Sequence, residues 1–311
     1  MKRREFVASL GAGLTGAFLP RLPLPRLRVE RFVERWSWVM GQAVHVMVFA
    51  ESEDQGLEAC AAALAELRRV EARLSVFDDA SDLSELNRHA GREPLRVDHD
   101  LHDVLAAAAR FQARTAGAFN AAVEPLMRLW GFRDRPLAAW PDRVPFEEAR
   151  EAVATAVVRM DGDMVSLPNA HTQLDFGGIA VGYGIDRAVA VLRAAGIRRG
   201  FVDVSGDCYG LGSPPGDADG WVVQIAGTQR DIRLRDTALA TSSETKSVVR
   251  LEFGIGAAIG HIMNPASGAP VDTDQQVTVV APTAIAADAL STGVLVRGAA
   301  PRGVRAILTP E

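Results

Sequence analysis

The chain has few cysteines, few aromatic residues and no excess of positive charge. Two cysteines, Cys60 and Cys208, stand far apart in its 311 residues, so there is no C-x-x-C metal spacing and at most one disulfide can form. The net charge is −5, and no basic stretch is interleaved with aromatic residues, so we expect no nucleic-acid partner. Hydrophobic residues make up 48% of the chain, enough to bury a large core in one or two domains.

The N-terminus lacks a hydrophobic run long enough to cross a bilayer as a helix. Lys2, Arg3 and Arg4 precede an uncharged, Gly/Ala-rich segment over residues 6–19. The R-R-x-F pattern resembles a twin-arginine export signal, and a generic Sec signal or a disordered basic start is the alternative. We therefore expect a signal and a Pro/Arg-rich linker over residues 1–35, a folded domain over 36–311, and a periplasmic or other extracytoplasmic location.

The rest of the chain predicts an α+β fold. Residues 38–50 have the pattern of a strand with a glycine break, and Asp98 can cap a helix whose apolar positions recur at helical spacing. Asp161-Gly162 predicts a hairpin, and a helix over 284–296 precedes a last strand. Strands mostly follow strands, which favours α+β over a doubly wound parallel sheet.

The stretch LDFGGIAVGYGID places four glycines between two aspartates. Ile179 breaks the G-x-G-x-x-G pattern and no Gly-Lys-Ser/Thr ending follows, so both common nucleotide-binding motifs are excluded. Glycine amides that open onto a helix N-terminus can bind a phosphate, and the alternative is a tight strand-to-helix turn. Asp175 beside a phosphate would need a cation, a ribose or a ring N–H as its partner.

The stretch ADALSTGVLVRG offers a candidate cation site. Asp288 and Thr292 stand four residues apart, on one face of a helix, and their carboxylate and hydroxyl oxygens suit a hard ion such as Mg²⁺. The alternative is a carboxylate that interacts with the helix dipole and a threonine that bonds back to its own helix.

The stretch GHIMNPASGAP places a histidine before a rigid turn. Asn264-Pro265 starts this turn and Gly268 closes it, so His261 would be held at the end of a strand. Such a histidine is either structural or a catalytic base.

In their order and spacing these motifs resemble those of the FAD:protein FMN transferases, the ApbE family. The resemblance covers Met40 to Gly298 and rests on Met40-Gly41, SVFDDASDLSELN, FNAAVEPLMRLWGF, DFGGIAVGYGID, VSGD, ALATSS, HIMNPASG and ADALSTGVLVRG. It implies an α+β, ApbE-like (T-fold-like) architecture of mixed sheets packed with helices, with the active site between the two halves.

The resemblance also implies an activity and a set of site residues. Members use Mg²⁺ to split the pyrophosphate of FAD and attach the FMN half to a Ser or Thr hydroxyl of an acceptor protein. Exported or membrane-bound electron-transfer proteins, such as subunits of Rnf-type or Na⁺-pumping NADH:quinone reductase complexes, are the implied acceptors. By motif, the flavin and adenosine sites would contain Met40, Phe77, Ala118, Phe119, Asn120, Asp175 and Ile262. The metal would be held by the Gly178 carbonyl, Asp288, Thr292 and Ser291, and His261 would be the catalytic base.

Some positions depart from the family pattern. Val181 stands where many members have a lysine that can reach the diphosphate of the cofactor, and Asn120 stands where members usually have aspartate. These departures favour an alternative function, an FAD-binding accessory or electron-transfer flavoprotein of the nitrous oxide reductase type. An FAD pyrophosphatase, which would need the same site with a poorly formed acceptor groove, is a further alternative. If the signal is not cleaved, the protein would also be attached to a membrane.

Overall fold

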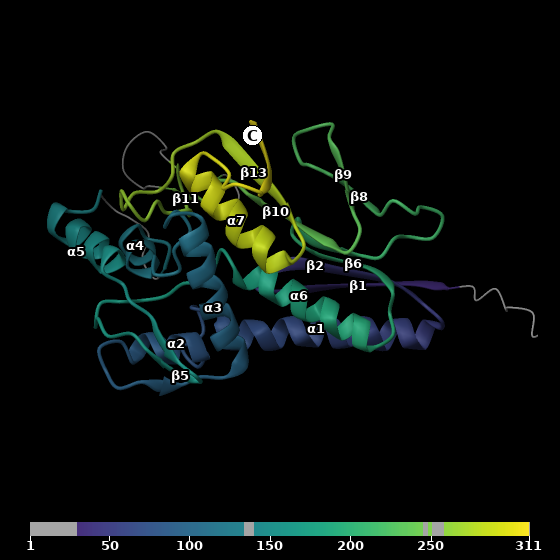
Figure 1. The fold of residues 1–311 in the computed structure, drawn as a ribbon, viewed down its shortest axis with the longest axis horizontal. Coiled ribbons are helices and arrows are strands. Elements are labelled where there is room, and N and C mark those ends of the chain that lie inside the picture. Colours follow the sequence, from purple (N-terminus) through teal and green to yellow (C-terminus); the bar gives the residue numbers. More distant parts are fainter. Residues whose placement is uncertain (1–29, 134–139, 245–247, 251–257, 311) are drawn as a thin grey trace, which may run out of the picture.

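The computed structural model describes residues 30–133, 140–244, 248–250 and 258–310. Its centre is a seven-stranded sheet, in which every pairing between neighbouring strands is antiparallel (Figure 1). In spatial order the strands are β1 (Arg31–Val39), β2 (Gln42–Ala50), β6 (Arg199–Val204), β7 (Asp207–Leu211), β10 (Thr237–Ser242), β13 (Gln275–Ala281) and β14 (Arg305–Pro310). The α+β class is confirmed, and this sheet is antiparallel rather than mixed.

The first hairpin begins earlier than the sequence predicts. Strand β1 starts at Arg31, before the expected domain start at residue 36, and pairs with β2 along its whole length. Met40 and Gly41, with φ of 56° and 67°, form the tight turn between the two strands. The reason for the difference is that only Val33 and Val39 of β1 are buried, so the strand lacks a hydrophobic alternation. The predicted signal lies in residues 1–29, outside the described residues.

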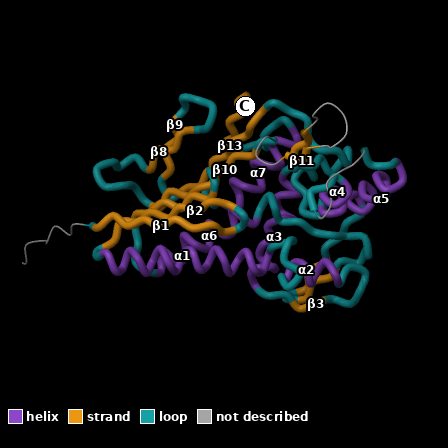
Figure 2. Tube along the Cα trace, turned by 180° about the vertical axis from the view of Figure 1, so that it is seen from behind, coloured by secondary structure: helices purple, strands orange, loops and turns teal. Residues whose placement is uncertain are grey.

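The two faces of the sheet are covered by different elements (Figure 2). Helices α1 (Glu53–Leu74) and α6 (Ala180–Ala194) lie on one face, over the main core, which includes Val44, Val46 and Val48 of β2. On the opposite face the hairpin of β8 (Trp221–Gln224) and β9 (Asp231–Leu234) packs on a separate cluster that includes Met47 and Phe201. Helix α7 (Ala284–Arg297) packs on β10 and β13.

The remaining elements gather beside one end of the sheet. They are α2 (Asp82–Arg88), β3 (Leu95–Arg96), α3 (His99–Arg114), α4 (Glu124–Leu129), α5 (Arg143–Ala154), β4 (Arg159–Asp161), β5 (Met164–Ser166), β11 (Val248–Arg250) and β12 (Ala258–Gly260). The hairpin at Asp161-Gly162 and the helix capped by Asp98 are confirmed. Cys60 and Cys208 are free and buried. Among the described helices, none has both the length and the hydrophobicity needed to cross a bilayer.

The glycine-rich stretch proves to be half turn and half helix. Helix α6 starts at Ala180, so Gly182 and Gly184 lie inside it and only Gly177 and Gly178 precede it. A Cβ added at Gly182 would lie 2.4 Å from the Ala284 carbonyl oxygen of α7. A Cβ at Gly184 would lie 2.8 Å from the Met40 side chain. Two of the four glycines therefore serve close packing rather than phosphate binding.

Helix α7 is capped by a side chain of α6. Asp186 accepts hydrogen bonds from the backbone N–H groups of Ala284, at 2.8 Å, and of Ile285, at 3.0 Å. Thr283 occupies the usual capping position but makes no such bond. Burial of the Asp186 carboxyl raises its pKa to about 6, although the two N–H groups act in the other direction.

Replacing Asp186 with asparagine should change the pH dependence of stability. Because the pKa is raised in the folded protein, the carboxyl favours folding most below about pH 4, and this contribution is lost as pH rises through about 6. The free energy of unfolding of the native protein, measured relative to Asp186→Asn, should fall by about 3 kcal/mol between pH 4 and pH 7. Urea denaturation across this pH range measures the difference, with Asp231→Asn, at an exposed position of β9, as the control. Parallel curves of unfolding free energy against pH for the native protein and Asp186→Asn would contradict the raised pKa of Asp186.

Candidate active site

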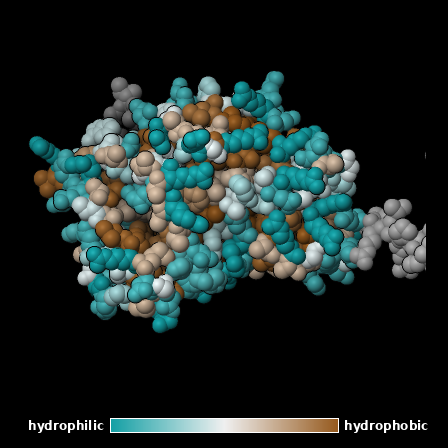
Figure 3. All heavy atoms as spheres, viewed as in Figure 1, coloured by the Kyte–Doolittle hydropathy of each residue, from teal (hydrophilic) through white to brown (hydrophobic). Residues whose placement is uncertain are grey.

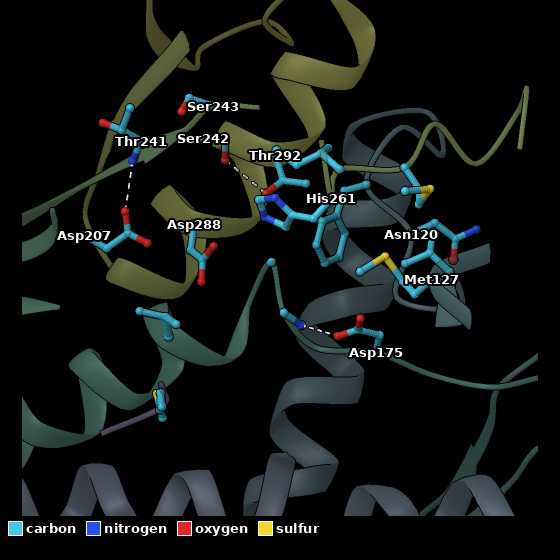
Figure 4. A pocket seen from close by; sticks show the side chains of 18 of the residues that line it. Asn120, Met127, Asp175, Asp207, Thr241, Ser242, Ser243, His261, Asp288 and Thr292 are labelled. Carbon is cyan, nitrogen blue, oxygen red and sulfur yellow. Dashed lines mark hydrogen bonds between the residues drawn. The ribbon is translucent and has the colours of Figure 1, made fainter. Parts of the chain in front are cut away.

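A cavity of about 640 Å³ lies at the end of the central sheet where the β1–β2 and β6–β7 turns meet α6 and α7 (Figure 4). Most of the predicted site residues line it, although they come from segments far apart in the sequence. They are Met40, Ala118, Phe119, Asn120, Asp175, Gly178, Val181, His261, Ile262, Asp288 and Thr292.

Two predicted residues lie outside the cavity lining. Phe77 is 77% exposed, and the Arg133 guanidinium carbon lies 4.8 Å from its ring centroid. Ser291 is buried, donates to the Asp288 carbonyl at 2.9 Å and shares a hydrogen bond with Ser242 at 2.8 Å. Ser291 therefore supports residues that line the cavity instead of facing it.

Asp288 is the buried acidic residue among those that line the cavity. Its Oδ2 accepts a hydrogen bond from the Gly182 N–H at 2.9 Å. Burial raises the pKa of Asp288 well above its usual range, and the negative charge of Asp207 raises it further. Asp207 lines the same cavity, and its Oδ1 accepts from the Thr241 N–H at 3.0 Å. Two carboxylates brought together in this way favour a bound cation.

Hydroxyl oxygens complete this part of the cavity. Thr292 Oγ1 lies 3.2 Å from Ser242 Oγ, and both side chains point toward His261 in Figure 4. A Cβ added at Gly178 would lie 3.0 Å from Thr292 Oγ1, so the Gly178 backbone approaches this hydroxyl closely. Carboxylate, hydroxyl and backbone oxygens without thiolates are the donors that Mg²⁺ prefers, so the residues fit the predicted ion.

Asp175 is held by an arginine that the sequence analysis did not single out. Arg133, whose side chain is 8% exposed, pairs with both Asp175 and the fully buried Glu124, and its Nη2 lies 2.5 Å from Glu124 Oε2. Asp175 Oδ1 also accepts from the Gly177 N–H at 2.6 Å. Of the partners expected beside Asp175, namely a cation, a ribose or a ring N–H, the protein itself supplies a cation, Arg133. In the sequence, the feature that could have pointed to Arg133 is its charge directly after the apolar stretch WGF.

His261 stands at the position that the NPASG turn predicts. Asn264 Oδ1 accepts from the Ala266 N–H at 3.0 Å, and the Gly268 N–H donates to the Asn264 carbonyl at 2.8 Å. This closed turn fixes the chain just after His261, and the ring points into the cavity (Figure 4).

Several lining residues were missed as site residues. Asp207 and Ser242 belong to motifs noted in the sequence, VSGD and ALATSS, but spacing alone does not show which side chains face a cavity. Others lie at the start of β2, at and within α4, and in the loop after His261; they include Gln42, Val123, Met127, Met263 and Pro265.

Comparison with known proteins identifies the family. The sequence model of the ApbE family matches residues 40–307. The chain belongs to the ApbE family. A Treponema pallidum protein named FAD:protein FMN transferase is 34% identical over 303 residues, covering 88% of this chain and 80% of that protein. A Vibrio cholerae protein of the same name is 30% identical over 244 residues, covering 75% of this chain and 71% of that protein.

Solved ApbE structures have the same fold. The apbe protein of Thermotoga maritima superposes with a TM-score of 0.76 at 27% identity, covering 86% of this chain and 87% of that one. The flavin transferase ApbE of Vibrio cholerae superposes with a TM-score of 0.72 at 25% identity, with the same coverage. The family and fold inferred from the motifs are therefore confirmed.

Replacing Arg133 with methionine should destabilise the protein by about 3 kcal/mol, because Glu124 then loses its buried partner. Adding Glu124→Gln to this variant should recover part of the loss, because Asp175 still lacks Arg133. The control is Arg128→Met: Arg128 pairs with the same glutamate but is 53% exposed, so its removal should cost less than about 1 kcal/mol. Urea denaturation measures all three variants, and equal losses for the two arginines would contradict the account.

Proposed function

We propose that this protein is an FAD:protein FMN transferase that splits FAD and attaches FMN to a Ser or Thr hydroxyl of an acceptor protein. The observation that carries the proposal is that eleven predicted site residues line one cavity. The chain also belongs to the ApbE family, and its relatives are named FAD:protein FMN transferase. Among them are a histidine, a buried carboxylate and a hydroxyl, the groups that phosphoryl transfer to a hydroxyl requires.

The oxygen cluster would hold Mg²⁺. Asp288, Thr292 and the Gly178 carbonyl would be the protein ligands, with Asp207 close enough to add negative charge. When bound, the ion would offset negative charge on the pyrophosphate oxygens and on the AMP leaving group. Because Val181 is buried and uncharged where many members have lysine, this chain would rely on the ion for that positive charge.

Other residues around the cavity would have separate roles in the transfer of FMN. His261 would take the proton of the acceptor hydroxyl as that oxygen bonds to the phosphorus of the FMN half. The bond from this phosphorus to the AMP oxygen breaks, so one P–O bond forms and one is lost. The backbone N–H group of Gly178 precedes α6 and would approach the diphosphate, whereas the Gly177 N–H already donates to Asp175 Oδ1.

One alternative function has an observation in its favour. The Asn120 Oδ1 accepts from the Ala122 N–H at 2.9 Å, so this oxygen serves a local turn. Asn120 and Val181 are the two positions that depart from the family pattern. An Asn120 oxygen that is already bonded and an uncharged Val181 leave fewer groups for transfer, which favours an FAD-binding accessory flavoprotein. An FAD pyrophosphatase would need the same site without a productive acceptor position.

Incubation with FAD, Mg²⁺ and an acceptor domain carrying a Ser/Thr flavinylation motif tests the proposal. Mass spectrometry should show the acceptor gain the mass of one FMN group. Asp288→Asn and Thr292→Val should each reduce this transfer by at least about a hundredfold, because they remove metal ligands, whereas Asp231→Asn should not. FAD that stays bound and intact would support the accessory flavoprotein, and release of FMN and AMP without acceptor labelling would support the pyrophosphatase.

We also propose that the protein is exported by the twin-arginine route and modifies an extracytoplasmic acceptor. The R-R-x-F sequence supports this, since both arginines are read by the receptor rather than as bulk charge.

The double substitution Arg3→Lys and Arg4→Lys should keep the protein in the cytoplasm, because it preserves charge but removes both arginines. Fractionation followed by immunoblotting measures the distribution, with a Sec-exported reporter in the same cells as control. Undiminished periplasmic accumulation of the variant would contradict the twin-arginine assignment.

A further inference from the structure

Strand β1 exposes three large aromatic side chains at the edge of the central sheet. Phe32, Trp36 and Trp38 are 51%, 65% and 71% exposed, and their even numbering places them on one face of the strand. On the face shown in Figure 3, hydrophobic residues form separate patches among hydrophilic ones. We call the three side chains the β1 aromatic face. Exposed aromatic residues that gather in this way mark binding surfaces.

Two of these rings are held in place. Trp36 stacks on His45 of β2 with ring centroids 3.7 Å apart, and His45 Nε2 is 2.7 Å from Glu34 Oε2. Phe32 lies against Phe49, with centroids 5.3 Å apart. Rigid rings lose little conformational entropy when a partner covers them.

Helix α1 packs on the other face of β1, and on the face with the aromatic side chains the β8–β9 hairpin packs over β2 and β6. Trp221 of the β8–β9 hairpin packs on Phe49 and Phe201, with centroids 6.1 and 5.4 Å apart. The same face of the sheet continues from β2 to β1. There the residue opposite Trp38 is the small Ala43. Among the described strands β1 lies at the edge of the sheet, so no described strand pairs with the backbone on its outer side.

The turn that follows strand β1 forms part of the lining of the active-site cavity. Strand β1 ends at Val39 and runs directly into Met40 and Gly41, which line the cavity together with Gln42. A macromolecule that brings a hydroxyl into the cavity would therefore pass close to Trp38.

We propose that the β1 aromatic face is the docking surface for the folded part of the acceptor protein. This inference rests on the proposed transferase function, which requires a protein substrate at the cavity mouth. The face would accept an apolar patch or an added edge strand of that substrate.

The charge on this face favours a protein over a bilayer. Glu34, 46% exposed, lies between Phe32 and Trp36 on the same side of the strand. A carboxylate at this place would resist insertion among lipid chains, and the net charge of −5 opposes anionic headgroups. A protein partner can instead offer a hydrogen-bond donor or a cation to Glu34.

The test measures how fast one variant transfers FMN to each of two substrates. The probes are the soluble domain of an Rnf-type flavinylated subunit and a short synthetic peptide that contains only its Ser/Thr flavinylation motif. With Trp36→Ala/Trp38→Ala, kcat/KM for the domain should fall by about tenfold or more, mainly through KM, because truncated aromatic anchors weaken docking. Transfer to the peptide should stay unchanged.

Two controls keep the result interpretable. Leu308→Ala, on the opposite edge strand β14, should leave both substrates unaffected. Trp36→Phe, which keeps a ring over His45, should retain most of the domain activity, and thermal unfolding should show that each variant is folded.

Three outcomes would overturn the inference. The first is an equal loss of activity on domain and peptide, and the second is no loss on either. The third is loss of binding to phosphatidylglycerol–phosphatidylethanolamine vesicles with unchanged transfer to the domain, which would assign the face to a membrane. If the native protein labels neither substrate, the proposed function itself fails, and the docking inference fails with it.

Discussion

The active site depends on the close approach of helices α6 and α7. The Gly182 N–H of α6 donates to the Asp288 carboxylate of α7, and Asp186 of α6 accepts from the first two N–H groups of α7. A side chain at position 182 would collide with the Ala284 carbonyl, so this approach requires glycine. Each helix therefore fixes the position of the other's functional residues.

This contact places a carboxylate where it is costly without a cation. Asp288 is 5% exposed and lies near Asp207, and both burial and this neighbour disfavour its charged form. In the absence of an ion the site thus works against the stability of the fold. Such local cost is expected where the group is kept for binding rather than for folding. The carboxylates of Glu124 and Asp175 differ from Asp288 in this respect, because Arg133 of the protein itself provides their positive charge.

The sequence predicted well those features that depend on local pattern. The α+β class, the hairpin at Asp161-Gly162 and helix α7 follow from periodicity and turn residues. The gathering of most predicted site residues around one cavity follows from the resemblance to the ApbE family. The sequence could not separate Gly177 and Gly178, which lie in the turn, from Gly182 and Gly184, which pack against other elements, because that difference depends on contacts between distant segments.

Features set by tertiary contact were missed for the same reason. The first residues of β1 show no alternation because one of their faces is exposed, so the strand was expected to start later. Arg133 gains its role only because the fold brings Glu124 and Asp175 to it. Phe77 was placed by motif at the cofactor, and it stacks on Arg133 outside the cavity lining.

The oxygen cluster at the α6–α7 contact is the hard-ion site that we propose. Crystals soaked with FAD and Mn²⁺ as an anomalous substitute for Mg²⁺ test it directly. The account predicts an anomalous peak about 2.0–2.4 Å from an Asp288 carboxylate oxygen, Thr292 Oγ1 and the Gly178 carbonyl. A cavity with bound FAD and no ion there would contradict it. So would a peak only at Asp98, His99 and Asp100, the acidic group in which Asp100 is already bonded to Arg69 and Tyr183.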